Sequence, residues 1–152
     1  MIIGVISDTH GLMRPEALEA LQGSDLILHA GDVGGPGVLG LLRAIAPTIA
    51  VRGNVDWGDW ADALAMTEAV EAEGLRLYML HVLADLDLDA PGAGFAAVIS
   101  GHTHRASAEV RDGVLYLNPG SAGPRRFRLP VTIARLHLAN RQLSHEIVRL
   151  RV

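Results

Sequence analysis

The first third of the chain alternates short apolar runs with segments of helical periodicity. The apolar runs are Met1–Ser7, Asp25–His29 and Thr48–Arg52, and they are typical of buried parallel strands. Between them, Pro15–Gln22 and Pro36–Ala46 begin with proline, as many helices do, and the second spaces its apolar residues for a buried face. The pattern therefore predicts a βαβαβ unit, whose ligands bind beyond the carboxyl ends of its strands.

The remainder of the chain carries strand patterns. A single apolar strand is predicted at Phe95–Ser100, and Asp85–Gly94 is predicted as a short helix and loop. The paired runs are Glu68–Glu73 with Leu75–His81, Ala106–Arg111 with Val114–Asn118, and Val131–Leu138 with Leu143–Leu150 across Ala139-Asn140-Arg141. We expect a second, mostly antiparallel sheet that packs on the first, within a single domain covering residues 1–152.

The amino-acid composition excludes several classes of protein and argues against some partners. The 152 residues are 49% hydrophobic and contain no cysteine, which excludes a disulfide scaffold, thiolate-bound zinc and thiol catalysis. A formal charge of −4 without a basic stripe argues against polymeric nucleic acid as a partner. No segment has the pattern of a signal peptide or a membrane span, so we expect a cytoplasmic protein with no membrane partner.

Polar residues with metal-binding side chains follow the predicted strands. They are Asp8, His10, Asp32, Asn54, His81, His102 and His104. Carboxylate, amide and imidazole donors without sulfur suit Mn, Fe, Zn, Ni or Co. Seven donors exceed one tetrahedral site, whereas two ions that share a carboxylate account for them. Asp32 is the expected bridge because its strand is central in the predicted order.

Together these motifs carry a family resemblance. In order, they are Asp8-x-His10, Gly31-Asp32, Gly53-Asn54-x-Asp56, His81 and Gly101-His102-Thr103-His104. This series resembles the calcineurin-like metallophosphoesterase superfamily. It is most similar to the small bacterial and archaeal phosphodiesterase branch, because Asn118-Pro119-Gly120-Ser121 follows the last motif. The resemblance implies an α/β fold, a four-layer α/β/β/α sandwich with two mixed β-sheets flanked by helices.

The resemblance also implies a set of ligands. One ion would be held by Asp8, His10, Asp32 and His104, and the other by Asp32, Asn54, His81 and His102. The implied cofactors are two divalent transition-metal ions, with Mn favoured and Ni, Co, Fe or Zn as alternatives. A hydroxide between the ions would attack phosphorus in line, which gives Asp32, Asn54 and His81 catalytic roles.

Two positions depart from the family pattern. Val55 stands where related proteins often carry a His or Cys, and such a His can protonate a leaving alkoxide. Because valine transfers no proton, we expect a preference for leaving groups of low pKa, such as aryl oxides. Val82 stands where the branch usually has glycine after the histidine, which makes the second ion the less secure of the two.

Residues near these motifs have two readings each. His29 is expected to be a packed histidine or one that supports a ligand, with a role as a metal ligand itself as the alternative, and Asp56 either orients a ligand histidine or ends a turn. Arg125 and Arg126 either receive a phosphate or form a solvated basic cluster. Trp57 either stacks on an aryl or base group or packs within its loop.

The function predicted on these grounds is hydrolysis of small-molecule phosphodiesters. Hydrolysis of a pyrophosphate bond or of a cyclic nucleotide stays open within the same mechanism. Two further alternatives are a phosphomonoesterase and a catalytically weak or inactive interaction scaffold of the same fold. The last predicted hairpin leaves an exposed edge, which would permit a homodimer without requiring one.

Overall fold

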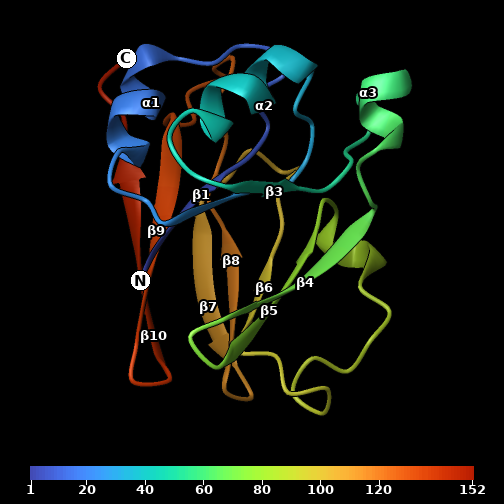
Figure 1. The fold of residues 1–152 in the computed structure, drawn as a ribbon, viewed down its shortest axis with the longest axis vertical. Helices are drawn as coiled ribbons and strands as arrows, with labels where there is room; N and C mark the ends of the chain where they lie inside the picture. Colours follow the sequence, from blue (N-terminus) through green and yellow to red (C-terminus); the bar gives the residue numbers. More distant parts are fainter.

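The computed structural model describes residues 1–152 and consists of two five-stranded sheets packed face to face (Figure 1). In spatial order, the first sheet contains β10 (Gln142–Arg149), β9 (Thr132–Ala139), β1 (Ile2–Ile6), β2 (Leu26–His29) and β3 (Thr48–Ala50). Strands β1, β2 and β3 are parallel, and β9 pairs antiparallel with β1. The predicted βαβαβ unit is therefore present, and β2 lies between its two partners.

The second sheet is mixed. Its order is β4 (Thr67–Ala72), β5 (Leu75–Leu80), β6 (Ala97–Ile99), β8 (Val114–Asn118) and β7 (Ser107–Arg111). The expectation of a mostly antiparallel sheet was wrong, because β6 pairs parallel with both β5 and β8. Local hairpin signals identify only the two outer, antiparallel pairs. The central strand reaches its place through crossover connections, which leave no short-range signal.

Two helices cover the outer face of the first sheet. They are α1 (Pro15–Leu21) and α2 (Pro36–Arg43), and each begins at its proline. Leu21 and Leu42 from these helices are fully buried in one cluster with Ile6 and Ile27 of the sheet. Burial of such side chains contributes roughly 2 kcal/mol each, so this layer fixes the strands whose carboxyl ends carry Asp8 and Asp32.

The two sheets bury a second cluster between them. Leu28 and Leu136 from the first sheet meet Leu77, Ile99 and Leu117 from the second, all at most 1% exposed. Alternate residues of the second sheet point the other way, as the period of a strand requires. These outward residues, among them Tyr78 and Val98, pack under Leu83, Leu86 and Phe95.

The fourth layer of the sandwich is thin. It consists of the 3₁₀-helix η1 (Leu83–Asp85) and the loop that follows. The loop lies in the segment Asp85–Gly94 that was predicted as a short helix and loop, whereas the helical turn begins two residues before that segment. The fold class is thus confirmed, with few helices on this side. One further element, the four-residue α3 (Asp59–Asp62), was not predicted, because a single turn is too short to display helical periodicity.

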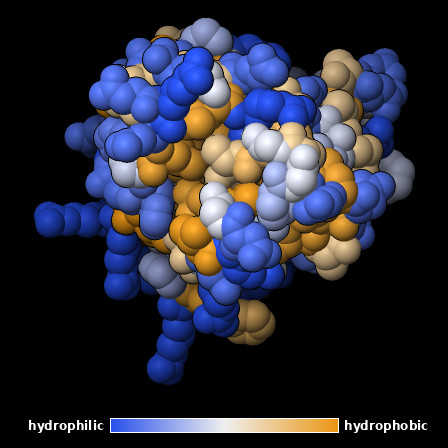
Figure 2. All heavy atoms as spheres, turned by 90° about the horizontal axis from the view of Figure 1, so that it is seen from below, coloured by the Kyte–Doolittle hydropathy of each residue, from blue (hydrophilic) through white to orange (hydrophobic).

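The two ends of the sandwich differ. Three hairpin turns lie at the lower end of Figure 1, at Glu73-Gly74, Asp112-Gly113 and Asn140-Arg141. The last is a two-residue turn, because Ala139 pairs with Gln142. Figure 2 shows this end with polar residues around exposed apolar atoms. None of the helices is long and apolar enough to cross a membrane.

Candidate metal centre

The carboxyl ends of five strands meet at the other end of the sandwich. The predicted ligands follow these strands as the sequence suggests, with Asp8 and His10 after β1, Asp32 after β2, Asn54 after β3, His81 after β5, and His102 and His104 after β6. Each sheet contributes, because the ends of β5 and β6 face those of β1 and β2. The site therefore lies across the junction of the two sheets.

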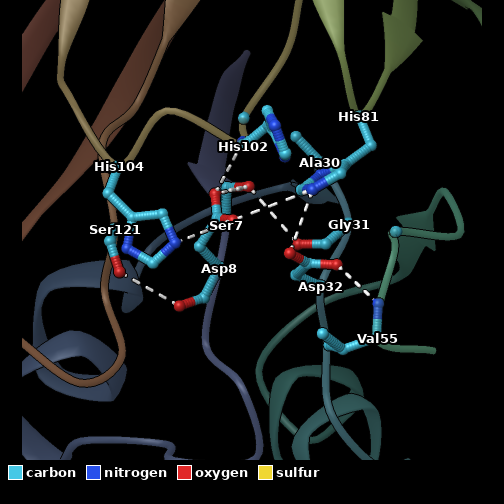
Figure 3. A network of polar contacts seen from close by, with 12 residues as sticks. Ser7, Asp8, Ala30, Gly31, Asp32, Val55, His81, His102, His104 and Ser121 are labelled. Atoms are coloured by element: carbon cyan, nitrogen blue, oxygen red, sulfur yellow. Dashed lines mark hydrogen bonds and ion pairs between the residues drawn. The ribbon is translucent and has the colours of Figure 1, made fainter. Parts of the chain in front are cut away.

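Six of the predicted ligands form two adjacent groups. Asp8, His10 and His104 form one, and Asp32, His81 and His102 form the other, with the potential ligand atoms of each group within 4.8 Å of one another. Figure 3 shows the second group beside Asp8 and His104. In each group carboxylate and imidazole atoms converge on a small volume, which is the arrangement that a divalent cation requires.

Several of these atoms lack the partners that burial normally demands. Asp8 Oδ1 and His81 Nε2 are buried and make no hydrogen bond. His104 Nδ1 also makes none, but the nitrogen of this ring that lies beside Asp8 and His10 is Nε2. Asp8 Oδ1 lies 3.4 Å from His104 Nε2 and 3.9 Å from His81 Nε2. Two donors bound to one ion at about 2.1 Å lie roughly 3.0–3.5 Å apart. The 3.4 Å between Asp8 and His104 matches shared coordination, whereas His81, at 3.9 Å, belongs to the other group. The residues fit divalent metal ions.

Asp32 contacts both groups. Its Oδ2 lies 3.1 Å from His81 Nε2 and 3.6 Å from His10 Nε2, which belong to different groups. Its Oδ1 accepts a hydrogen bond of 3.0 Å from the backbone N–H of Val55. Because one oxygen is held by the backbone, the other is oriented toward both groups, as a bridging ligand would be.

The backbone of the ligand loops adopts an uncommon conformation. Five of the seven residues have left-handed φ angles of 47° to 73°, namely Asp8, His10, Asp32, His102 and His104. Such conformations cost of order 1 kcal/mol or more for a residue with a side chain and persist only when surrounding contacts enforce them. The sequence gives a partial signal, because Asp and His are enriched among non-glycine residues with positive φ.

Asp56 supplies one set of these contacts. This carboxylate is 1% exposed and accepts hydrogen bonds from the N–H groups of Val33, Gly34 and Gly53, at 3.2, 2.9 and 2.8 Å. It thereby ties the loop that carries Asp32 to the loop that carries Asn54. Asp56 also ends a turn, as one of its two sequence readings had it, because its N–H donates to the Gly53 carbonyl at 3.4 Å. The contacts of its carboxylate with loop amides were not predicted.

Gly53 brings the same two loops into close contact. A Cβ atom added to Gly53 would collide with the backbone nitrogen and the carboxylate of Asp32. The residue at this position must therefore be glycine if the Asp32 carboxylate is to keep its place.

His29 supplies a second set of contacts, from complete burial under the site. Its Nδ1 accepts the N–H of Gly31 at 3.1 Å, and its Nε2 lies 3.0 Å from Thr9 Oγ1, which donates to the Val33 carbonyl. The Thr9 hydroxyl proton is thus committed, so His29 Nε2 carries the donating proton and the ring is neutral. This histidine links the Asp8–His10 loop to the loop of Asp32, in agreement with a supporting role.

Three further polar residues hold the loops, and the sequence analysis had not given them this role. Ser7 Oγ donates to Asp8 Oδ2 at 2.7 Å, and Ser121 Oγ donates to the Asp8 carbonyl at 3.0 Å. Asn118 Nδ2 donates to the Gly101 carbonyl at 2.9 Å and so anchors the loop of His102. Ser7 directly precedes Asp8, and Asn118 and Ser121 belong to the Asn-Pro-Gly-Ser motif that supports the family resemblance, so both placements are signals that the sequence does contain.

The electrostatics favour an ionised carboxylate at Asp32 and a neutral imidazole at His104. Burial works against the charge of Asp32, but contact with His81 and the Val55 N–H outweighs it and lowers the pKa to about 2. Burial lowers the pKa of His104, and the positive charge of Arg126 acts in the same direction. At His81 burial is outweighed by the Asp32 carboxylate and the Ala30 carbonyl, so its pKa is raised.

The contact of His81 with Ala30 also fixes the orientation of the ring. His81 Nδ1 lies 2.7 Å from the Ala30 carbonyl oxygen and donates its proton there. The unpartnered Nε2 therefore faces Asp32 and Asp8, in the orientation that suits a ligand nitrogen. The neighbouring Val82 is half-buried and does not prevent this arrangement.

The remaining candidates lie at the rim. Asn54 is exposed and lines a hollow together with His81, whereas Arg125 and Arg126 line a second hollow together with His10 and His104. Trp57 is 72% exposed and lines neither hollow. The structure therefore brings both arginines to the site and leaves Trp57 outside it.

Residues 1–141 match the family model described as the calcineurin-like phosphoesterase superfamily domain, and the chain belongs to this family. A probable metallophosphoesterase of the archaeon Methanothermobacter thermautotrophicus is 34% identical over 164 residues, which cover 98% of this chain and 92% of the relative. A family of phosphoesterases and a cluster of metal-binding side chains thus agree on the general chemistry.

Solved structures agree on the fold. An archaeal phosphodiesterase superposes with a TM-score of 0.80 at 25% identity, covering 97% of this chain and all of the other. Vps29 of Chaetomium thermophilum superposes with a TM-score of 0.85, covering 99% of this chain and 89% of its own length. Its 20% identity makes this second likeness one of fold alone.

Replacement of Gly53 by alanine tests the close contact with Asp32. We expect Gly53→Ala to weaken metal binding by about tenfold or more, because the added methyl group displaces the Asp32 carboxylate. Calorimetric titration with Mn²⁺ or Zn²⁺ measures this. Gly40→Ala is the matched control, since Gly40 lies in α2 with open space around it. Equal affinities in the two variants would contradict the contact.

Acid stability tests the role of His29. Burial lowers its pKa from 6.5 to about 3, so the unfolded chain binds more protons than the folded one between these values. Its contribution to stability is complete above pH 6.5 and is lost as the pH falls toward 3.

We expect the metal-free protein to lose about 2 to 3 kcal/mol more of its free energy of unfolding between about pH 7 and about pH 4.5 than His29→Gln does. Denaturant titrations at both pH values measure the difference. The exposed His145 gives the control His145→Gln, which should retain the pH dependence of the parent chain. A His29→Gln variant with the same pH dependence as the parent would show that His29 is not held neutral.

Proposed function

We propose that the protein is a dinuclear metal-dependent phosphodiesterase that acts on small-molecule phosphodiesters. The observation that carries the proposal is the convergence of two groups of donors on Asp32, all buried or half-buried except the exposed His102, with atoms that have no partner in the protein itself. We propose Asp8, His10, Asp32 and His104 as ligands of one ion. Asp32, Asn54, His81 and His102 are proposed for the other, with Mn²⁺ as the favoured metal.

Bound ions would supply an activated water at neutral pH and would offset negative charge on the phosphoryl oxygens. The protein residues supply the geometry. Asp32 is held by Val55 N–H, and His81 is oriented by the Ala30 carbonyl. In the proposed reaction the oxygen of water bonds to phosphorus, the ester P–O bond breaks, and the leaving oxygen receives a proton from solvent.

A preference for diesters is supported by the charges at the rim. A monoester dianion carries more charge than a diester and is commonly held by several cationic side chains. Arg125 and Arg126 both line the hollow beside His10, but the guanidinium of Arg125 also donates to the Val152 carbonyl. Arg126 is therefore the one arginine at this rim without such a contact.

Metal reconstitution tests the function. We expect metal-stripped protein to be inactive and to regain hydrolysis of bis-p-nitrophenyl phosphate with Mn²⁺, Co²⁺ or Ni²⁺, with much weaker hydrolysis of p-nitrophenyl phosphate. Asp32→Asn and His102→Ala should each reduce the rate more than about 100-fold, since each removes a proposed ligand.

Matched controls are available for both substitutions. Asp112→Asn changes a turn residue whose left-handed conformation suits asparagine, and His145→Ala changes an exposed histidine of β10. Both should keep the parent activity. A folded protein that binds each metal and hydrolyses neither ester would overturn the proposal and favour the interaction scaffold.

The leaving group tests the consequence of Val55. Its side chain is 44% exposed beside the site and carries no proton to donate. We expect rates for a series of aryl methyl phosphates to fall steeply as the pKa of the phenol rises, and dialkyl phosphates to react slowest. Val55→His should flatten this dependence. Equal rates for aryl and alkyl diesters in the parent protein would refute the role assigned to this position.

A further inference from the structure

Two hollows flank the metal centre. The first, called the His81 hollow, has a volume of about 180 Å³ and is lined by Asn54 and His81 together with Met66, Leu80 and Val82. The second, called the Arg126 hollow, is wider, at about 470 Å³, and is lined by His10, His104, Arg125, Arg126 and Phe127. Each hollow borders a different group of ligands, as the positions of His81 and His104 in Figure 3 indicate.

The His81 hollow has an apolar wall and no available cation. Met66 is 66% exposed, which leaves a large apolar side chain in water directly beside a polar site. The single arginine in the wall, Arg52, is already engaged, because its Nη1 lies 3.3 Å from Asp62 Oδ1 and its Nε donates to the Asp56 carbonyl. The wall also includes Asp85, whose carboxylate would repel a negative charge.

The Arg126 hollow has the opposite character. The arginine ion pairs of the structure involve Arg52, Arg76, Arg111 and Arg135, so the Arg126 guanidinium has no carboxylate partner. It nevertheless lies close enough to the centre to lower the pKa of His104. Phe127, its neighbour in sequence, is 88% exposed and lines the same hollow.

From this asymmetry we infer that the substrate is a phosphodiester with two unlike substituents, an uncharged and largely apolar one in the His81 hollow and a negatively charged one in the Arg126 hollow. The inference rests on the proposed function and specifies its substrate class. A monoester would fill one hollow only, whereas a diester of this kind places a complementary group in each.

Binding to the His81 hollow can be observed without turnover. The chain has four methionines, so methyl-labelled methionine gives four resolvable NMR signals. On titration with diphenyl phosphate we expect the Met66 signal to shift and the signal of Met79, which is fully buried in the core, to stay in place. Met66→Asp should weaken this binding about fivefold or more, judged by the shifts of backbone amides, whereas Val110→Asp on β7 should not.

A matched pair of esters tests the Arg126 hollow. Thymidine 5′-(p-nitrophenyl phosphate) and its 3′-phosphorylated form share a leaving group and differ by one negatively charged group. We expect the 3′-phosphate to lower KM about fivefold in the metal-loaded protein, with little change in kcat. Arg126→Gln should abolish this advantage. Arg43→Gln, which removes the same charge from an exposed position of α2, should retain it.

The outcomes separate this inference from the proposed function. If the metal-loaded protein hydrolyses neither ester, the proposed function fails, and the methionine titration still decides whether the His81 hollow accepts an apolar substituent. If both esters are hydrolysed but the 3′-phosphate gives no advantage, or if Met66 does not respond to diphenyl phosphate, the inference is wrong while the proposed function stands.

Discussion

The main physical constraint on this structure is that two carboxylates and several imidazoles are held together in a partly dehydrated space, which makes the free energy of folding less favourable. Asp8 is completely buried and one of its oxygens makes no hydrogen bond. Burial of an unpaired polar group is unfavourable by roughly 1 to 3 kcal/mol, and more for a charge. A bound cation would make this contribution to the free energy favourable, because it would provide a partner for the unpaired ligand atoms. The hydrophobic core must therefore offset the destabilisation that these buried polar groups cause.

The need for this stabilisation by the core explains the architecture around the site. The apolar clusters lie on both faces of the first sheet, so its strands are held rigidly up to their carboxyl ends. Beyond these ends the loops are held by polar groups, with Asp56 and His29 each bonded to two separate loops. Left-handed residues persist there because these contacts leave the loops no alternative conformation. The ligands are thus held rigidly in two ways. The apolar clusters, which form a platform, hold the strands, and the hydrogen bonds of Asp56 and His29, which form a polar network, hold the loops.

The contrast between platform and network also explains what could be predicted. The ten strands and two main helices follow from local apolar periodicity, and the ligands follow from their position after strands. The parallel placement of β6 could not be read in this way, because it depends on packing between distant segments. The triple amide contact of Asp56 was missed for the same reason, since its partners Val33 and Gly34 are more than twenty residues away in sequence.

The residues of the two hollows show where sequence reasoning ends. Met66 has no motif around it, and Phe127 would ordinarily be expected inside the protein, yet both are exposed at the metal centre. Single exposed apolar residues are common on protein surfaces, so it is the position of these two in hollows beside the metal-binding side chains that supports the proposed substrate. In the proposed function the metal ligands would determine the reaction, and the walls around them would determine its substrate. The proposed chemistry follows from the sequence motifs, whereas the proposed selectivity follows only from the folded chain.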